Sequence, residues 1–452
     1  MERVDSKRTV QGQLSSGIAS LGIAAAIVFF VSTAAVRPAH AQATRIQQSE
    51  VSLVPVSDAD EHDSVGSAAA IGNSGNTMVV GAENADGAQV GAGAAFVFDK
   101  INGNWVRTAS LFANDGKGVP LPDGKFQNDA YAQSVAISAD GNTVIVGAPQ
   151  HNHSGQGTTG AVYVFQRVNG VWSQQAELRS PSPSVFDFFG AGQGGGGIGI
   201  SGDTIVVTDD GNFTSIPGAV DVFKRVNGVW TFSTQLLVPD DFNFIPSSLA
   251  IDGNTVAVGS SFSDAPNAFF AGVAYVFRFD DGKWSAPVTV AAADATAGGS
   301  FGFSVSLRGN TLAVGANTQP GATAQSGAAY VFSSDEGKWT QKAKLMASDG
   351  LDFDNFGCAI SVSGQTVFVG ADVHTPPATS VAGAAYIYQI GGSGQWRQVA
   401  ELAPGDTAIS GGGEYGISVA IQNNTLVVGA DTARPAVEGY AGGEAYAYRL
   451  NP

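Results

Sequence analysis

A segment resembling GNTLAVGA (309–316) occurs seven times in this chain of 452 residues, at intervals of 51 to 66 residues. Repetition at such a period constrains the fold strongly, because each repeat is one supersecondary unit that buries its apolar surface only against its neighbours. A single simple core does not suit a chain of this length, whereas a repeat array does. The copies are GNTMVVGA (75–82), GNTVIVGA (141–148), GDTIVVTD (202–209), GNTVAVGS (253–260), GNTLAVGA (309–316), GQTVFVGA (364–371) and NNTLVVGA (423–430).

Three further segments accompany this copy, and together they predict four strands per repeat. In the fifth repeat FGFSVSL (301–307) precedes the copy, GAAYVF (327–332) follows it, and WTQKAKL (339–345) comes last. Each has the length of a strand and alternates apolar with small or polar residues. We name the four strands A to D in chain order. The pattern predicts an all-β fold, a seven-bladed β-propeller of four-stranded antiparallel blades.

Short turns join the strands in pairs. Strands C and D are separated by pairs such as Asn169-Gly170, and strands A and B by pairs such as Asp252-Gly253. For the A–B pairs we expect type I′ turns, in which both central residues have positive φ. The longer B–C and D–A connections then share the opposite face of the ring, and variable loops on a rigid scaffold are where binding usually occurs.

The last repeat lacks the fourth strand. Six tryptophans mark strand D in six repeats, but the chain ends at Pro452, directly after the seventh strand C (443–448). Near the N-terminus VPVSDAD (54–60) resembles LMASDGL (345–351), which follows a strand D. We therefore predict that residues 46–56 supply strand D of blade 7, so that the N-terminal strand closes the ring and removes an open sheet edge.

The N-terminus has the pattern of a targeting segment. Basic residues precede an uncharged, mostly apolar run (17–36), and AHA (39–41) fits a cleavage site between small residues. We expect a signal peptide at 1–41 and one mature domain at 42–452, secreted or held in the periplasm or cell envelope, with no membrane span in the mature chain. An uncleaved membrane anchor is the alternative, because the apolar run is long for a signal peptide.

The charge balance excludes two classes of partner. The net charge is −17, and removal of residues 1–41, with four basic and two acidic residues, makes it −19. Nucleic acid and anionic membrane surfaces both require basic patches. The single cysteine, Cys358, follows an aromatic-glycine pair on strand A, and we expect it to be a small buried core residue. We expect a monomer.

The two glycine-containing signatures resemble the FG-GAP repeat family, the seven-bladed propeller of integrin α-chain heads and of bacterial exported proteins. FG occurs at Phe301-Gly302 and Phe356-Gly357, and GAP at 147–149. The resemblance covers about residues 45–452. It implies a calcium-binding D-x-D-x-D-G-x-x-D loop between strands A and B. Here short turns with at most one acid replace that loop, whereas Ca²⁺ needs several oxygen ligands. We expect no calcium site of the family type and no cofactor.

Two groups are the candidate metal ligands. Asp349, Asp352 and Asp354 lie in the acidic D–A segment SDGLDFDNFG (348–357), where a solvated loop with capping carboxylates is the alternative. His151 and His153 lie in the B–C loop of blade 2, while His62 lies in the acidic segment that enters blade 1. Two histidines separated by one residue on a loop are weak evidence for a metal, and exposed polar side chains are the alternative interpretation.

Aromatic residues gather in the loops of blades 3 and 4. Neighbouring blades would bring them into one apolar patch suited to a protein or carbohydrate partner, and packing between blades is the alternative. The candidates are Phe186, Phe188, Phe242, Phe262, Phe269 and Phe270, whereas Phe189 and Phe244 are expected to pack between blades.

The sequence contains no G-x-S-x-G, H-E-x-x-H or P-loop motif. We therefore expect an exported, non-catalytic binding or adhesion module that uses the B–C and D–A loop face, and not an enzyme. One alternative is a polysaccharide hydrolase or lyase with acidic residues near the central channel. The other is a structural component of the cell envelope.

Overall fold

The computed structural model describes residues 51–52, 63–86, 91–116, 118–120, 126–152, 157–184, 187–192, 196–211, 218–238, 244–374, 383–403, 413–431 and 442–450. The chain divides into two units, Met1–Gln42 and Ala43–Pro452, and the propeller lies in the second. The expected signal peptide at 1–41 lies outside the described residues. Among the described residues, no helix has the length and apolar character needed to span a membrane.

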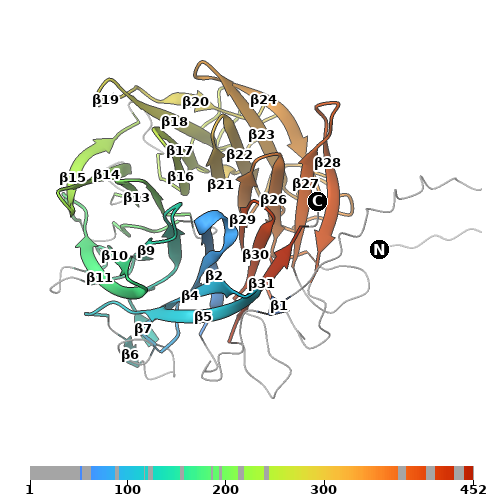
Figure 1. The fold of residues 1–452 in the computed structure, drawn as a ribbon. Helices are drawn as coiled ribbons and strands as arrows, with labels where there is room; N and C mark the ends of the chain where they lie inside the picture. Colours follow the sequence, from blue (N-terminus) through green and yellow to red (C-terminus); the bar gives the residue numbers. More distant parts are fainter. Residues whose placement is uncertain are drawn as a thin grey trace, which may run out of the picture. The chain divides into compact units, whose positions relative to one another are not determined.

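Seven antiparallel sheets form a propeller ring, which confirms the expected fold (Figure 1). The first strand of each sheet borders the axis and the fourth is outermost. Strand A is β2 (Val65–Gly72), β8 (Ser134–Ile137), β12 (Ile198–Ser201), β16 (Ser248–Asp252), β21 (Phe301–Arg308), β25 (Ile360–Ser363) or β29 (Ser418–Gln422) in blades 1 to 7. Strand B is β3 (Thr77–Ala82), β9 (Thr143–Ala148), β13 (Thr204–Asp209), β17 (Thr255–Ser260), β22 (Thr311–Ala316), β26 (Thr366–Ala371) or β30 (Thr425–Ala430).

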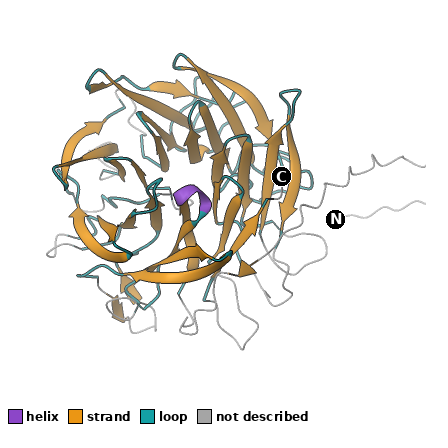
Figure 2. Cartoon of the chain, viewed as in Figure 1, coloured by secondary structure: helices purple, strands orange, loops and turns teal. Residues whose placement is uncertain are grey.

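The outer half of each blade follows the same plan. Strand C is β4 (Ala94–Ile101), β10 (Ala161–Val168), β14 (Ala219–Val226), β18 (Val273–Asp280), β23 (Ala328–Asp335), β27 (Ala384–Ile390) or β31 (Glu444–Arg449). Strand D is β5 (Asn104–Leu111), β11 (Val171–Leu178), β15 (Val229–Leu236), the pair β19 (Lys283–Trp284) and β20 (Val288–Val290), β24 (Lys338–Leu345), β28 (Trp396–Leu402) or β1 (Val51–Ser52). The only helix of the described residues is the short 3₁₀ turn η1 (Asn73–Gly75), which is purple in Figure 2.

The hydrophobic core lies between blades and explains why the repeats stack. In one cluster Val79 and Val97 of blade 1 pack with Val144, Val146 and Tyr163 of blade 2. Burial of such a side chain contributes about 1.5–3 kcal/mol. The apolar face of one blade is therefore covered only when the next blade is present.

The N-terminal strand closes the ring, as predicted, although of the predicted segment 46–56 only residues 51–52 are among the described residues. β1 pairs antiparallel with β31, with Val51 opposite Ala447 and Ser52 opposite Tyr446. Blades 1 and 7, blue and red in Figure 1, also share a core cluster that contains Met78 and Val427. The seventh blade lacks a strand-D tryptophan because its strand D comes from the other end of the chain.

Two glycine positions of the repeat are required by steric constraints. The glycine of each FG pair takes a positive φ, as at Gly302 (+90°), which side chains rarely adopt. Its carbonyl lies so close to Gly259 of the preceding blade that a Cβ there would come within 1.9 Å of the oxygen. Strand A adds a hydrogen bond at these junctions, because the hydroxyl of Ser304 donates to the carbonyl of Gly357 at 2.8 Å.

The turn types differ from the expectation for strands A and B. In blades 3 to 7 the two central residues begin at the glycine or asparagine, and only that first residue has positive φ, as at Gly253 (+57°). This is the pattern of type II′ and not of type I′ turns. In blades 1 and 2 the A–B connection is longer than two residues. Type I′ geometry occurs instead between strands C and D, as at Asn169 (+51°) and Gly170 (+81°).

Two local features were not predicted from the sequence. Strand D of blade 4 is split into β19 and β20 around Pro287, whose ring nitrogen donates no hydrogen bond to a ladder. A small hairpin of β6 (Gly118–Pro120) and β7 (Phe126–Asn128) lies in the connection between blades 1 and 2. Such insertions leave the blade plan intact, because the long connections lie outside the sheets.

Candidate functional site

The B–C and D–A connections build one irregular face, in contrast to the short turns at the other end of the blades. In blade 4 the B–C connection (261–272) meets the D–A connection that enters blade 5, because Gly298 N donates to the carbonyl of Phe269 at 3.2 Å. In blade 5 the B–C connection meets the next D–A connection, because Phe353 N donates to the carbonyl of Gln325 at 2.9 Å. Adjacent long loops therefore support one another.

An aromatic pair stands on this face in blade 4. The rings of Phe269 and Phe270 lie 4.1 Å apart between centroids, and the residues are 63% and 40% exposed. Asp264 fixes the loop, because its Oδ1 accepts from the backbone N–H of Phe270 at 2.8 Å. Phe270 has a φ of +51°, a conformation that bulky residues rarely adopt and that costs about 1–3 kcal/mol. The loop thus holds two large apolar side chains in water at an energetic cost.

The other aromatic candidates are placed differently. Phe262 lies in the same loop and is 55% exposed, whereas Phe188 in blade 3 is half-buried. Phe186 and Phe242 lie outside the described residues. Phe189 and Phe244 are buried and make edge contacts with Phe223 and Tyr275, as core residues do.

Two exposed apolar residues of this face escaped the sequence analysis. Leu351 and Phe353 lie in the connection that enters blade 6, and Phe353 is 67% exposed. Phe353 also has a positive φ, of +70°. The segment LDFDNF (351–356) could have indicated this exposure. Phe356 belongs to the FG pair and packs in the core, which leaves the neighbouring Phe353 without a core position. The acidic composition of that segment instead predicted a cation site at its carboxylates.

A histidine and two carboxylates converge in blade 6. His374 of the B–C connection is 1% exposed, and its Nε2 lies 3.8 Å from Oδ2 of Asp349 in the D–A connection. Glu401 of β28 completes the group, whose three ligand atoms lie within 4.8 Å of one another. Burial and the carboxylate of Asp349 raise the pKa of Glu401 to about 7. Two acidic groups thus face each other here.

The buried carboxylate of Asp354 orients this histidine. Nδ1 of His374 lies 2.7 Å from Oδ2 of Asp354, a carboxylate oxygen that can accept a hydrogen bond from the ring N–H. The other ring nitrogen, Nε2, has no hydrogen-bond partner among the described residues. On the other side, the hydroxyl of Tyr386 donates to Oδ1 of Asp349 at 3.1 Å.

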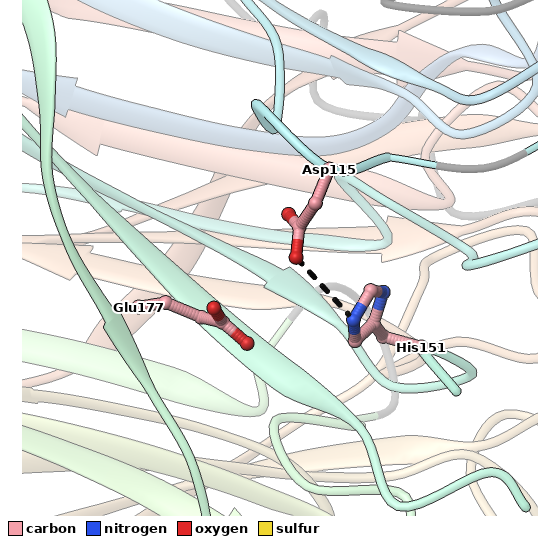
Figure 3. A group of neighbouring side chains, drawn as sticks. All are labelled: Asp115, His151 and Glu177. Atoms are coloured by element: carbon pink, nitrogen blue, oxygen red, sulfur yellow. Dashed lines mark ion pairs between the residues drawn. The ribbon is translucent and has the colours of Figure 1, made fainter. Parts of the chain in front are cut away.

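Blade 2 carries the same arrangement with one addition (Figure 3). Asp115, His151 and Glu177 surround a common point, with 3.8 Å between His151 Nε2 and Asp115 Oδ2. Nδ1 of His151 lies 2.9 Å from Oδ2 of the buried Asp129. Here a cation is already present, because Nε of Arg179 donates to Glu177 Oε1 at 2.6 Å. The carboxylate of Glu177 raises the pKa of Arg179.

Blade 5 shows the same frame with a lysine in it. The hydroxyl of Tyr330 donates to Asp294 Oδ1 at 2.9 Å, while Gln319 takes the histidine place. Lys344 is opposite Tyr330 in the sheet, as Glu401 is opposite Tyr386. Its ammonium group donates to Asp294 Oδ2 at 2.7 Å.

The sequence-based metal candidates are thus separated by the structure. Asp349 joins His374 and Glu401, and Asp354 contacts the far side of the imidazole. Asp352 is exposed and accepts from Gln325 N at 2.9 Å, so it caps a loop. His151 joins Asp115 and Glu177, while His153 and His62 lie outside the described residues. Four site residues were not predicted from the sequence, because their proximity follows from strand register and not from sequence spacing: Asp115, Glu177, His374 and Glu401.

The axis of the ring offers a different surface. The first strands surround a cavity of about 240 Å³. Its described lining is mostly apolar, with serines from several blades, and Arg308 is the only charged side chain among these residues. Cys358 does not line this cavity. It is buried against blade 7, where its thiol donates to the carbonyl of Gly416 at 3.5 Å. Burial raises the pKa of this thiol, as expected of an inert core cysteine.

Comparison with protein families identifies the repeat. Four segments match the FG-GAP repeat: residues 105–165, 284–332, 339–388 and 396–448. Each begins at the tryptophan of strand D and ends with strand C of the next blade, so the family unit is offset from the blade by one strand. The chain is therefore a seven-bladed propeller that contains FG-GAP repeats. Among the curated proteins, no match to the chain is found.

Proposed function

We propose that the protein is a non-catalytic binding module that holds a protein or carbohydrate partner on the face of its B–C and D–A connections. The exposed pair Phe269 and Phe270 is the observation that carries this proposal. Aromatic side chains provide large contact areas with few rotatable bonds, and they dominate the energy of many interfaces. A loop that keeps two of them exposed through a strained backbone favours a role outside the fold.

The central cavity supports this choice over catalysis. The alternative of a polysaccharide-active enzyme requires acidic residues near the channel, where a hydrolase uses a pair of carboxylates. The described residues that line the cavity include no aspartate or glutamate. Export through residues 1–41 and action outside the cytoplasm belong to the same proposal, and N-terminal sequencing of the exported protein tests that part.

A binding screen with paired variants tests the proposal. The wild-type protein is applied to arrays of glycans and of cell-surface proteins, beside a Phe269→Ser/Phe270→Ser variant. A Val168→Ser/Val171→Ser variant is the matched control, because these two valines are 57% and 69% exposed beside a C–D turn of blade 2. We expect the phenylalanine variant to bind its ligand at least about tenfold more weakly, as for truncation of hot-spot residues.

The control variant should bind like the wild type. Equal binding by the phenylalanine variant would refute the proposal. Release of reducing ends from a polysaccharide would favour the enzyme, and concentration-dependent self-association in sedimentation would favour an envelope component.

A further inference from the structure

The group at Asp349, His374 and Glu401 in blade 6 has an unsatisfied centre. Its imidazole is almost fully buried, Nδ1 contacts Asp354, and Nε2 lies beside the carboxylates of Asp349 and Glu401 without a hydrogen-bond partner among the described residues. A buried nitrogen without a partner costs free energy comparable to a lost hydrogen bond. Buried polar groups of this kind therefore call for a bound water or ion.

The equivalent places in blades 2 and 5 indicate which kind of ligand suits this group. In blade 5 the ammonium group of Lys344 lies against Asp294, and in blade 2 the guanidinium group of Arg179 lies against Glu177. Both blades share the Tyr–Asp hydrogen bond of blade 6. In blade 6, among the described residues, no lysine or arginine forms an ion pair with Asp349 or Glu401, and His374 Nε2 lies 3.8 Å from Asp349 Oδ2. The fold thus sets a basic side chain against one of these carboxylates in two blades, whereas in blade 6 Asp349 and Glu401 face each other without one.

We infer that blade 6 binds a divalent transition-metal ion of the Zn²⁺ type through Nε2 of His374 and the carboxylates of Asp349 and Glu401. An imidazole nitrogen favours such ions over Ca²⁺ and Mg²⁺, which prefer oxygen ligands throughout. The contact of Nδ1 with Asp354 is the carboxylate–histidine arrangement that orients most metal-binding imidazoles.

The distances suit an ion after a small closure. Two ligands of a tetrahedral Zn²⁺ ion, each about 2.0–2.2 Å from it, lie about 3.4 Å apart. Here His374 Nε2 and Asp349 Oδ2 are 3.8 Å apart. Asp349 needs to move by only a few tenths of an ångström, whereas the ligand atom of Glu401 lies within 4.8 Å of the other two and closes up to about 1.4 Å by rotation of its half-buried side chain. A water molecule can complete the shell. The ion would tie a D–A connection, a B–C connection and the outer strand of blade 6 together. This site is separate from the aromatic pair of blade 4, so its existence does not depend on the proposed binding function.

Metal titration of the full chain tests the inference. The protein is freed of metal with a chelator and titrated with Zn²⁺ in competition with a chromophoric chelator, and Ca²⁺ is titrated for comparison. We expect one tight Zn²⁺ equivalent, weaker binding of Ca²⁺, and an X-ray absorption spectrum with nitrogen and oxygen ligands at about 2.0–2.2 Å and no sulfur. A higher melting temperature with Zn²⁺ should accompany binding, because the ion binds the folded state.

Three variants locate the ion. Glu401→Gln keeps the shape of the side chain and should weaken Zn²⁺ binding by about tenfold or more. Glu401→Lys copies blade 5 and should abolish binding while the metal-free protein stays folded, because the ammonium group takes the place of the ion. Glu177→Gln, at the equivalent place in blade 2, should leave the tight equivalent unchanged. Absence of tight Zn²⁺ binding, sulfur ligation, wild-type affinity in both Glu401 variants, or loss of binding in Glu177→Gln alone would each overturn the inference.

Discussion

Asp221 gives the sharpest prediction about stability, because it is a fully buried carboxyl group on β14 of blade 3. It occupies the place of Tyr163 in β10 and Tyr386 in β27. Burial, with the nearby carboxylates of Asp209 and Asp187, raises the pKa of Asp221 from the ordinary 3.8 to about 7. The folded protein therefore keeps a proton that the unfolded chain releases near pH 4. Raising the pH from 4 to above 7 must favour unfolding.

The size of this effect follows from the two pKa values. Their difference corresponds to about 4 kcal/mol in full, at about 1.4 kcal/mol per pH unit, of which about 3 kcal/mol falls between pH 5 and pH 8. A ring of about 400 residues has an unfolding entropy of about 0.8 kcal/mol/K, so the loss corresponds to about 3–4 °C in melting temperature.

Asp221→Asn removes the ionisation and nearly preserves the shape. Both proteins are measured by differential scanning calorimetry at pH 5 and pH 8. The melting temperature of the variant minus that of the wild type should be about 3–4 °C larger at pH 8 than at pH 5. Asp335→Asn, at an exposed C–D turn, is the control and should show no such gain. A difference between Asp221→Asn and wild type that does not change with pH would refute the reasoning.

Three further predictions concern closure, calcium and the junction of blades 1 and 2. Deletion of residues 42–56 removes β1 and exposes the edge of β31, so the melting temperature should fall and dimers should appear in light scattering; an unchanged melting temperature would contradict closure. Millimolar Ca²⁺ should move the melting temperature by less than about a degree, and a rise of several degrees would reveal a calcium site. Arg167→Met breaks an ion pair between blades, in which Nη1 of Arg167 lies 3.0 and 2.8 Å from the two carboxylate oxygens of Asp99. Chemical denaturation should show a loss of about 1–3 kcal/mol in the free energy of unfolding. Arg225→Met is the control and should lose less than about 1 kcal/mol, because its partner Asp203 is exposed. Hydrogen bonds from Thr108 and Thr77, together with the Arg167 guanidinium, hold the pKa of Asp99 below its ordinary value despite burial. The stabilisation by the Arg167–Asp99 pair should therefore persist above pH 4 and vanish as the pH falls through the lowered pKa. Equal losses of stability in Arg167→Met and Arg225→Met would refute the assignment of the larger effect to the Arg167–Asp99 pair.

The ring was predictable from the sequence because its causes are local and repeated. Each GNTLAVGA-like copy alternates at the period of a strand, and each x-Gly pair ends one. Closure was predictable for a similar reason, because residues 54–60 resemble residues 345–351, which follow strand D of blade 5. The prediction of type I′ turns between strands A and B was wrong, because the sequence does not show whether Gly253 is the first or the second central residue of the turn. In the structure Asp252 pairs with Thr255, which makes Gly253 the first.

The blade 6 group was only partly predictable, because its members come from three separate segments. Asp349 was noticed in an acidic run, but neighbours in that run do not join it. His374 and Glu401 reach it through the B–C connection and through the register that sets Glu401 opposite Tyr386. Comparison of QQAEL, QKAKL and QVAEL at strand D of blades 2, 5 and 6 contains the signal, since the same place holds Glu177, Lys344 or Glu401. That signal acquires meaning only when the facing aspartate is known.

Hydrogen exchange with a bound partner tests the central claim most directly, which is that the B–C and D–A connections form the binding face. The partner captured in the array screen is added, and amide exchange is compared with that of the free protein. The account predicts protection in residues 261–272 and in the adjoining connection at 294–300. It predicts unchanged exchange in the A–B and C–D turns of the same blade, at 252–255 and 280–283. Protection confined to those turns, or to the outer strands, would contradict it.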